Sequence, residues 1–173
     1  MFFEIFINDK FYLMKKSCLK SSFGFGIASG VITTLGLMVG LFASTNSRGV
    51  VLGGILTIAV ADSMADAVGM HFSEESEGIH TEKEIWLTTI YTFLSKLVVT
   101  ASFLPLLFLL SLKLAMILNI IWGFILLSVF SYSMAKQQKN SPFRAISEHV
   151  LIMAFVIVAT YYLGTLIDKY IIT

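Results

Sequence analysis

Five long apolar stretches, separated by short polar connections, dominate the chain. Each supplies the roughly 20 residues that a helix needs to cross a membrane. The stretches cover 23–43, 49–72, 85–110, 114–135 and 146–167. Only the third is interrupted by both a basic residue and a proline, Lys96 and Pro105. The pattern predicts an all-α integral membrane protein, with five transmembrane helices packed as antiparallel hairpins in one domain over 21–173.

Residues 1–20 differ from these stretches because charged residues are scattered among aromatic and aliphatic ones. A cleavable signal peptide fits poorly, since charges interrupt the apolar region and the basic residues follow it. We expect an amphipathic N-terminal segment in the cytoplasmic headgroup layer, with its lysines toward anionic lipid.

The basic residues predict how the chain is oriented. With a cytoplasmic N-terminus, eight basic residues lie in the cytoplasm, and only Arg48, Lys113 and Lys169 lie outside. Cytoplasmic connections are normally the ones enriched in lysine and arginine. The sequence therefore predicts a multi-pass protein with its N-terminus inside and its C-terminus outside.

Composition supports a membrane protein and narrows the functional classes. The 173 residues are 57% hydrophobic and 13% charged, against about 25% charged in a soluble domain. A formal net charge of +1 gives no reason to expect a nucleic-acid partner. The single cysteine excludes an intramolecular disulfide and a cysteine cluster for zinc. The sequence contains no pattern of an activated nucleophile, so it does not predict an enzyme.

Acidic residues continue the second apolar stretch toward the cytoplasm. Residues three and four apart share a helix face, so these acids form a stripe about 22 Å long at 1.5 Å per residue. The stripe contains Asp62, Asp66, Met70, Glu74 and Glu77, with His71 beside it. A charged aspartate inside a bilayer is costly unless paired or hydrated, and is usually functional. This donor set suits Fe²⁺ or Mn²⁺, and carboxylates alone also suit Mg²⁺ or Ca²⁺.

An ion pair within the bilayer is the alternative explanation for these acids. Lys96 lies about 15 Å into the third span by helix rise, as deep as Asp62 in the second. A Lys96–Asp62 pair would explain both charges without a metal, and would leave Asp66 free as a ligand. The acidic residues of 74–84 are also open to a second interpretation, as a solvated loop.

Glycines four residues apart recur in the first two spans. Three small-xxx-small matches begin at Gly26, Gly36 and Gly49. In lipid, this spacing lets helix backbones approach closely. Taken alone, it predicts packing or dimerisation rather than chemistry.

The ordered set of motifs resembles the vacuolar iron transporter family, whose five-span members act as dimers and move Fe²⁺ and Mn²⁺ out of the cytosol. Similar stretches lie at 26–40, 61–73 and 159–164. The matching residues of the first two are Gly26, Gly30, Thr33, Thr34, Gly40, Ala61, Asp62, Gly69 and Ser73. The resemblance implies a metal path between the first two spans. Residues expected to line it or pack around it are Gly26, Ser29, Gly30, Thr33, Gly36, Gly40, Gly69 and Ser73.

The sequence departs from the family pattern at the residues that matter most. Ser29 replaces the first-span aspartate, Asp66 replaces a methionine, and Met70 replaces a glutamate. We hypothesise that Asp66 substitutes for the missing carboxylate, with two copies across a twofold axis binding one cation. The Glu-rich domain of plant and yeast-type members is reduced to a rim of Glu74, Glu75, Glu77 and His80. This short connection favours a compact form from a prokaryotic cell membrane.

The sequence thus predicts a homodimeric exporter of Fe²⁺ or Mn²⁺, coupled to protons, with the metal as substrate and no permanent cofactor. The expected metal ligands, from the cytoplasm inward, are Glu77, Glu74, His71, Met70, Asp66 and Asp62. A relative that no longer transports, acting as a membrane interaction or metal-sensing subunit, is the alternative. The change at Ser29 and a Lys96–Asp62 pair would favour that alternative.

Overall fold

The computed structural model describes the backbone of residues 2–172 and the side chains of residues 21–171. Its elements are α1 (Phe2–Thr45), α2 (Arg48–Glu77), α3 (Glu82–Ala101), α4 (Leu104–Leu109), α5 (Leu112–Gln137), α6 (Pro142–Ile167) and the π-helical η1 (Asp168–Ile172). Within the described residues, five segments are long and apolar enough to cross a membrane: Ser21–Thr45, Arg48–Glu77, Glu82–Leu109, Leu112–Gln137 and Pro142–Ile171. The predicted five-span, all-helical fold is confirmed. The amphipathic arrangement expected for 1–20 lies outside the described side chains.

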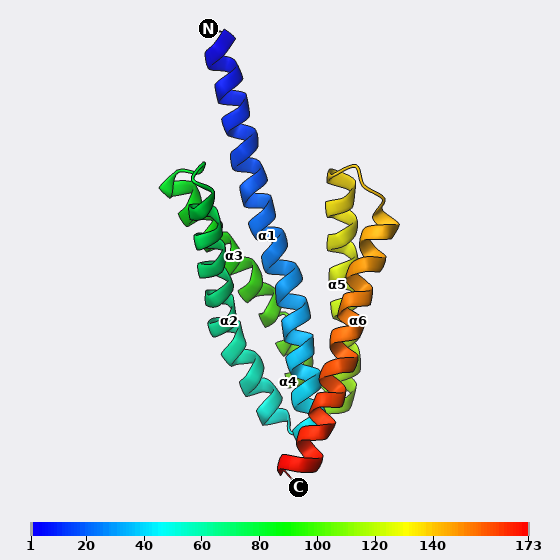
Figure 1. Cartoon of the computed structure of the whole chain (residues 1–173). Coiled ribbons are helices and arrows are strands. Elements are labelled where there is room, and N and C mark those ends of the chain that lie inside the picture. The colour runs from blue at the N-terminus through cyan, green and yellow to red at the C-terminus, as the bar shows by residue number, and fades with distance from the viewer. Residues whose placement is uncertain (1, 173) are drawn as a thin grey trace.

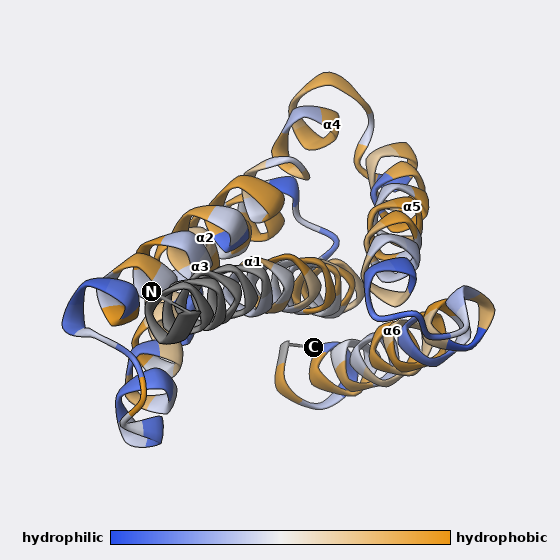
Figure 2. Cartoon of the chain, turned by 90° about the horizontal axis from the view of Figure 1, so that it is seen from above, coloured by the Kyte–Doolittle hydropathy of each residue, from blue (hydrophilic) through white to orange (hydrophobic). Residues whose placement is uncertain are grey.

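Helix α1 lies at the centre of the bundle. It contacts α2 and α3 on one side and α5 and α6 on the other, and the two pairs diverge from the end that carries the C-terminus (Figure 1). We call this end the C-terminal end. The opposite end, which holds the α2–α3 and α5–α6 connections, is called the loop end. Figure 2 shows hydrophilic residues gathered in both of these connections.

The turn between α2 and α3 is fixed by local backbone chemistry. Helix α2 continues through its acidic residues to Glu77, five residues beyond the end of the apolar stretch at Phe72. It stops at Gly78, whose φ of 65° is in the left-handed region that glycine adopts most easily. Glu84 then accepts a hydrogen bond from the Thr81 backbone N–H at 3.0 Å, which forms a capping box at the start of α3. This short turn brings residue 80 back beneath the end of α2.

The third span is broken where Pro105 was expected to interrupt it. Proline lacks a backbone N–H and clashes with the preceding turn, so α3 ends at Ala101 and α4 begins at Leu104. The fully buried Asn119 of α5 donates its amide N–H to the Phe103 carbonyl oxygen at 3.1 Å. Helix α5 thereby supplies a hydrogen-bond donor for a backbone carbonyl at the break. Such a donor is needed because lipid cannot form hydrogen bonds with the backbone.

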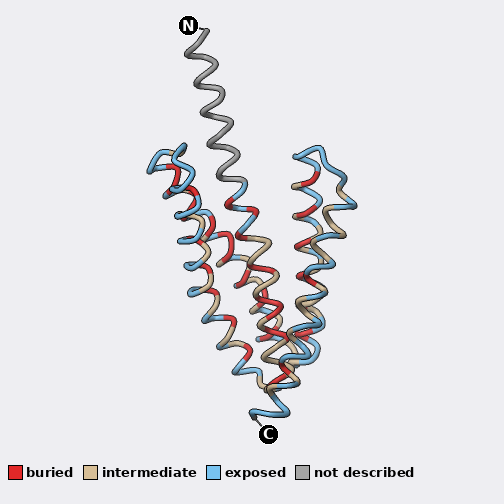
Figure 3. The backbone as a smooth tube through the Cα atoms, in the orientation of Figure 1, coloured by how far each residue is buried: buried red, intermediate tan, exposed pale blue. Residues whose placement is uncertain are grey.

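Apolar side chains cover the outside of the bundle as well as its centre. Phe72, Val98 and Phe155 are 64%, 65% and 72% exposed, whereas buried positions concentrate along α1 and α3 (Figure 3). Lipid is as apolar as these side chains, so their exposure suits a multi-pass membrane protein. The buried apolar cluster joins α1, α2, α4, α5 and α6, and includes Leu35, Ile55 and Leu107.

Candidate functional site

Three helices bring four polar side chains together inside the membrane-spanning part of the bundle. Lys96 of α3 is fully buried, and its Nζ lies 2.6 Å from Asp62 Oδ2 and 2.5 Å from Asp66 Oδ2. Ser29 of α1 accepts a hydrogen bond from Lys96 Nζ at 2.9 Å and donates one to Asp66 Oδ2 at 2.6 Å. We call these residues the Lys96 cluster. When its charged groups are ionised, the cluster has two negative charges and one positive charge.

The Lys96–Asp62 ion pair, which was the alternative to a metal site, is therefore present, but Asp66 is not left free as that alternative assumed. Aspartates four residues apart on α2 lie one turn apart on the same face, and one ammonium reaches both. Among the described residues, Asp62 Oδ2 has no aligned hydrogen-bond donor, so its contact with Lys96 is an ion pair without a hydrogen bond. Asp66 is held more firmly, because both Lys96 and Ser29 donate to it.

Two glycines of α1 allow α3 to approach closely enough for this contact. A Cβ at Gly26 would collide with Ser95 Oγ and lie 2.9 Å from the Thr92 carbonyl oxygen. A Cβ at Gly30 would lie 3.3 Å from Lys96 Cγ. These glycines, expected to pack around the site, do lie beside it. The site also includes α3, which the expected path between the first two spans left out.

The other residues expected along the path lie away from the Lys96 cluster or bond elsewhere. Thr33 donates its hydroxyl to the Ser29 carbonyl oxygen at 2.9 Å, an ordinary bond within α1. A Cβ added at Gly36 would lie 3.0 Å from Val156 Cγ1 of α6. Gly40 likewise faces α6, whereas Gly69 and Ser73 are exposed on the surface of α2.

A buried polar stripe runs along α3, and the hydropathy pattern did not predict it. Its residues are spaced four apart and are all buried: Glu84, Thr88, Thr92, Lys96 and Thr100. Thr34 of α1 donates to Thr100 Oγ1 at 3.1 Å, one turn beyond the lysine. The four-residue spacing was the signal that could have identified the stripe. Threonine is only weakly polar, so a hydropathy average over the span hides it.

Two buried hydroxyls lie within one turn of the Lys96 cluster, one on α2 and one on α3. Ser63 Oγ and Thr92 Oγ1 are buried hydroxyls with no hydrogen-bond partner among the described residues. Buried hydroxyls are normally satisfied, so these two are available to a bound ion or its hydration shell. Toward the C-terminal end, the Thr34–Thr100 pair comes first, and the fully buried Leu35, Ile55 and Phe103 lie beyond it. The site is therefore polar toward one end of the bundle and closed by apolar side chains toward the other.

A second group of donors lies at the loop end, where α2 turns into α3. His80 Nε2 lies 3.1 Å from Glu74 Oε2 and 3.6 Å from Glu77 Oε2. One ligand atom from each residue lies within 4.8 Å of the others. We call these residues the loop-end cluster. Its donors, two carboxylates and an imidazole, suit a divalent transition metal. The Glu74 side chain is only 9% exposed, which argues against its interpretation as part of a solvated loop.

His71 and Met70 lie between the two clusters along α2 but join neither. His71 Nδ1 lies 2.9 Å from Thr89 Oγ1, and the imidazole stacks edge-on with Trp86 at 4.9 Å between ring centroids. The Thr89 hydroxyl donates to the Ile85 carbonyl oxygen, so Nδ1 carries the proton in the bond to Thr89. The four acids of the predicted stripe therefore separate into two groups, about 12 Å apart along the helix from Asp66 to Glu74.

The Lys96 cluster can hold one cation at a time. A divalent ion bound by Asp62 and Asp66 would occupy the space between the carboxylates that the Lys96 ammonium now fills. Ser29 would then offer the ion a neutral oxygen, a suitable ligand for a hard or borderline metal. Metal binding through the Oδ2 atoms of both aspartates and the present position of the ammonium are therefore mutually exclusive.

The resemblance to iron transporters rests on the motifs in 26–40 and 61–73. The structure places Ser29 and Asp66, two of the departures from the family pattern, in direct contact with each other. It also adds Lys96, which the motifs did not include, as the shared partner of both. In comparisons with known proteins, no protein-family model, curated protein or solved structure matches the chain.

Proposed function

We propose that the protein moves divalent transition-metal ions, Fe²⁺ or Mn²⁺, out of the cytosol in exchange for protons. One observation carries this proposal: a fully buried ammonium, Lys96, is held between the carboxylates of Asp62 and Asp66 inside a membrane-spanning bundle. Ionisable groups at this depth are expensive and commonly serve ion or proton movement. Two carboxylates on one helix face supply the charge that a divalent cation requires.

Lys96 provides the physical reason for proton exchange. A divalent ion that binds Asp62 and Asp66 displaces the ammonium, which then lacks a counter-charge in a medium of low dielectric constant. An unpaired buried charge is strongly unfavourable, so the displaced lysine releases its proton. The cluster with a divalent ion, two carboxylates and a neutral amine has no net charge. Return of a proton to Lys96 then favours release of the metal.

The surroundings of the cluster support a route from the loop end. The loop-end cluster collects metal, and the ion then passes Met70 and the polar stripe of α3 to reach Asp66. With the predicted orientation, this entrance faces the cytoplasm. The apolar side chains beyond Lys96 close the opposite side, so release requires α1 and α2 to move relative to the rest of the bundle.

Metal flux into proteoliposomes tests the proposal. The wild-type protein is expected to move radioactive Mn²⁺ or Fe²⁺ faster when an opposing proton gradient is imposed. Asp66→Asn removes a carboxylate that binds the ion, so flux is expected to fall to the level of empty liposomes. Glu148→Gln is the matched control, since the one ion pair that Glu148 forms with a described residue is with Arg144, on the exposed face of α6. Wild-type flux in the Asp66 variant would rule the proposal out.

A non-transporting metal-sensing or membrane interaction subunit is the second candidate. The observation in its favour is that Lys96 neutralises part of the charge on both aspartates and leaves neither free. In that case the ion pair is purely structural, and metal binds only at the loop-end cluster. Metal flux distinguishes the two candidates. The second candidate predicts that the purified protein binds metal and that His80→Ala abolishes this binding, but that the wild type moves no metal across the membrane.

We further propose that the protein forms a homodimer through α2. Small residues recur every fourth position on its exposed surface: Gly49, Gly53, Thr57, Ala61, Ala65, Gly69 and Ser73. A Cβ added at Gly49, Gly53 or Gly69 meets nothing within 4 Å in its own protomer. Packing within the chain therefore does not require these glycines. In lipid, such a stripe allows a second helix to approach closely.

Enlarging this stripe is expected to separate the protomers. Gly53→Leu together with Gly69→Leu should weaken dimerisation at least about tenfold in Kd, equivalent to about 1.4 kcal/mol. Single-molecule subunit counting in liposomes measures the change. The double alanine variant at the same positions is the matched control, because alanine keeps the surface small. A leucine variant that remains as dimeric as the wild type would place the dimer contact elsewhere.

A further inference from the structure

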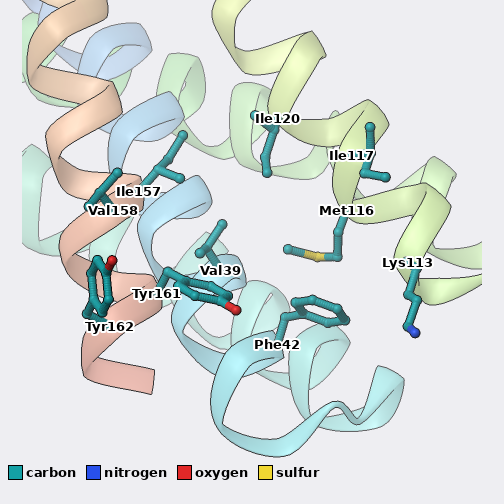
Figure 4. A pocket seen from close by; sticks show the side chains of 10 residues that line it. All are labelled: Val39, Phe42, Lys113, Met116, Ile117, Ile120, Ile157, Val158, Tyr161 and Tyr162. Carbon is teal, nitrogen blue, oxygen red and sulfur yellow. The ribbon is translucent and has the colours of Figure 1, made fainter. Parts of the chain in front are cut away.

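A groove of about 590 Å³ opens on the side of the bundle near the C-terminal end. It lies between α1, α5 and α6, far from the Lys96 cluster, and nothing in the proposed transport cycle uses it. Its walls are apolar apart from a lysine amine and two tyrosine hydroxyls (Figure 4). The polar residues are Lys113 at the start of α5 and Tyr161 and Tyr162 near the end of α6.

The shape of the groove suits a hydrocarbon chain that enters from the bilayer. On α5, the lining residues from Lys113 to Ile120 cover about 10 Å along the helix axis. Met116 and Val39 form a buried floor, whereas Ile117 is 57% exposed at the side. The groove is therefore open laterally, toward the space that lipid occupies around a membrane-spanning bundle. Its volume is within the range of small-molecule sites, about 300–1,000 Å³.

The mouth of the groove carries positive charge. Among the described residues, Lys113 has no acidic partner, and Asp168 is the only acidic side chain at the C-terminal end. Arg48 donates from Nη2 to the Leu110 carbonyl oxygen at 2.6 Å, which holds a second cation beside the start of α5. The cap residue Ser111 makes no side-chain capping bond, so the first N–H groups of α5 still lack side-chain caps.

We propose that the groove binds an anionic phospholipid. One acyl chain lies between α1, α5 and α6, and the phosphate contacts the Lys113 amine and the N-terminal N–H groups of α5. A helix N-terminus favours phosphate. Lys113, the second residue of α5, adds a full positive charge at the same place. A zwitterionic lipid offers the same chain but brings its own cation near Lys113 and Arg48. The charge at the mouth therefore selects a headgroup with net negative charge.

Native mass spectrometry of the purified protein with phosphatidylglycerol or phosphatidylcholine tests this site. The wild type is expected to retain phosphatidylglycerol preferentially, and Lys113→Gln should reduce that preference about fivefold, as expected for about 1 kcal/mol per basic side chain. Lys169→Gln is the matched control, because Lys169 is a cation of the same end that lies over Tyr170 outside the groove. Ile117→Trp should reduce the binding of both lipids by filling the groove.

Three results would overturn the proposal. Equal retention of the two lipids by the wild type would show that the headgroup is not selected. Equal losses in the Lys113 and Lys169 variants would show only a general attraction to the charged end. If Ile117→Trp instead converted dimers to monomers and left lipid binding unchanged, a second copy of the chain would be the occupant of the groove.

Discussion

Lys96→Met is expected to lower the free energy of unfolding by about 3 kcal/mol, because removal of one partner leaves the other charges of a buried pair uncompensated. The estimate is at the lower end of the usual range, since the Asp62 and Asp66 side chains are 31% and 20% exposed and keep some hydration. Unfolding in mixed detergent micelles, followed by circular dichroism, measures the change.

Two further variants separate the loss of charge balance from the loss of packing. Lys83→Met removes an exposed lysine from the same helix and should change stability by no more than about 0.5 kcal/mol. Adding Asp62→Asn and Asp66→Asn to Lys96→Met should restore most of the lost stability, since neutral replacement of a whole buried ion pair is often nearly neutral. If the triple variant is no more stable than Lys96→Met, lost packing and not charge imbalance explains the effect.

The sequence predicted the spans and one ion pair, because each depends on a single physical rule. Hydropathy over about 20 residues identified the five crossings, and helix rise placed Lys96 level with Asp62 on the neighbouring antiparallel helix. The same rule could not decide between Asp62 and Asp66. That choice depends on how far α2 rotates toward α3 and on the reach of the lysine stem, and both are set by tertiary packing.

Helix ends and interhelical partners were harder to predict. The apolar stretch ends near Phe72, but α2 continues to Glu77, because glutamate supports a helix as well as leucine does and the backbone changes only at Gly78. Pro105 predicted a break, yet nothing in the sequence paired Asn119 with the Phe103 carbonyl oxygen, which is a contact between different helices. The loop-end cluster likewise depends on the turn that returns His80 to Glu74.

Lys96→Arg is expected to keep the fold and stop metal flux. Arginine preserves the positive charge between Asp62 and Asp66, so the loss of stability should stay within about 1.5 kcal/mol, as for other substitutions that keep a buried interaction. In water, arginine holds its proton about 100-fold or more tightly than lysine does. A bound ion therefore cannot displace it by deprotonation. Proteoliposome flux of Mn²⁺, measured with and without a proton gradient, should fall to the background level in this variant.

The combination of a stable fold and absent flux distinguishes the two roles of Lys96. If the role of Lys96 is purely structural, the Lys96→Arg variant should still transport metal, and both its stability and the dependence of its flux on the proton gradient should match those of the wild type. Lys83→Arg controls for the chemistry of the substitution, since Lys83 is exposed in the first turn of α3. Wild-type flux in Lys96→Arg would refute the competition between metal and ammonium while leaving the metal site intact. If Lys96→Arg loses flux because the protein unfolds, the substitution is not conservative. The flux comparison is then made with the double variant Lys96→Gln and Asp62→Asn, which leaves the net charge of the site unchanged.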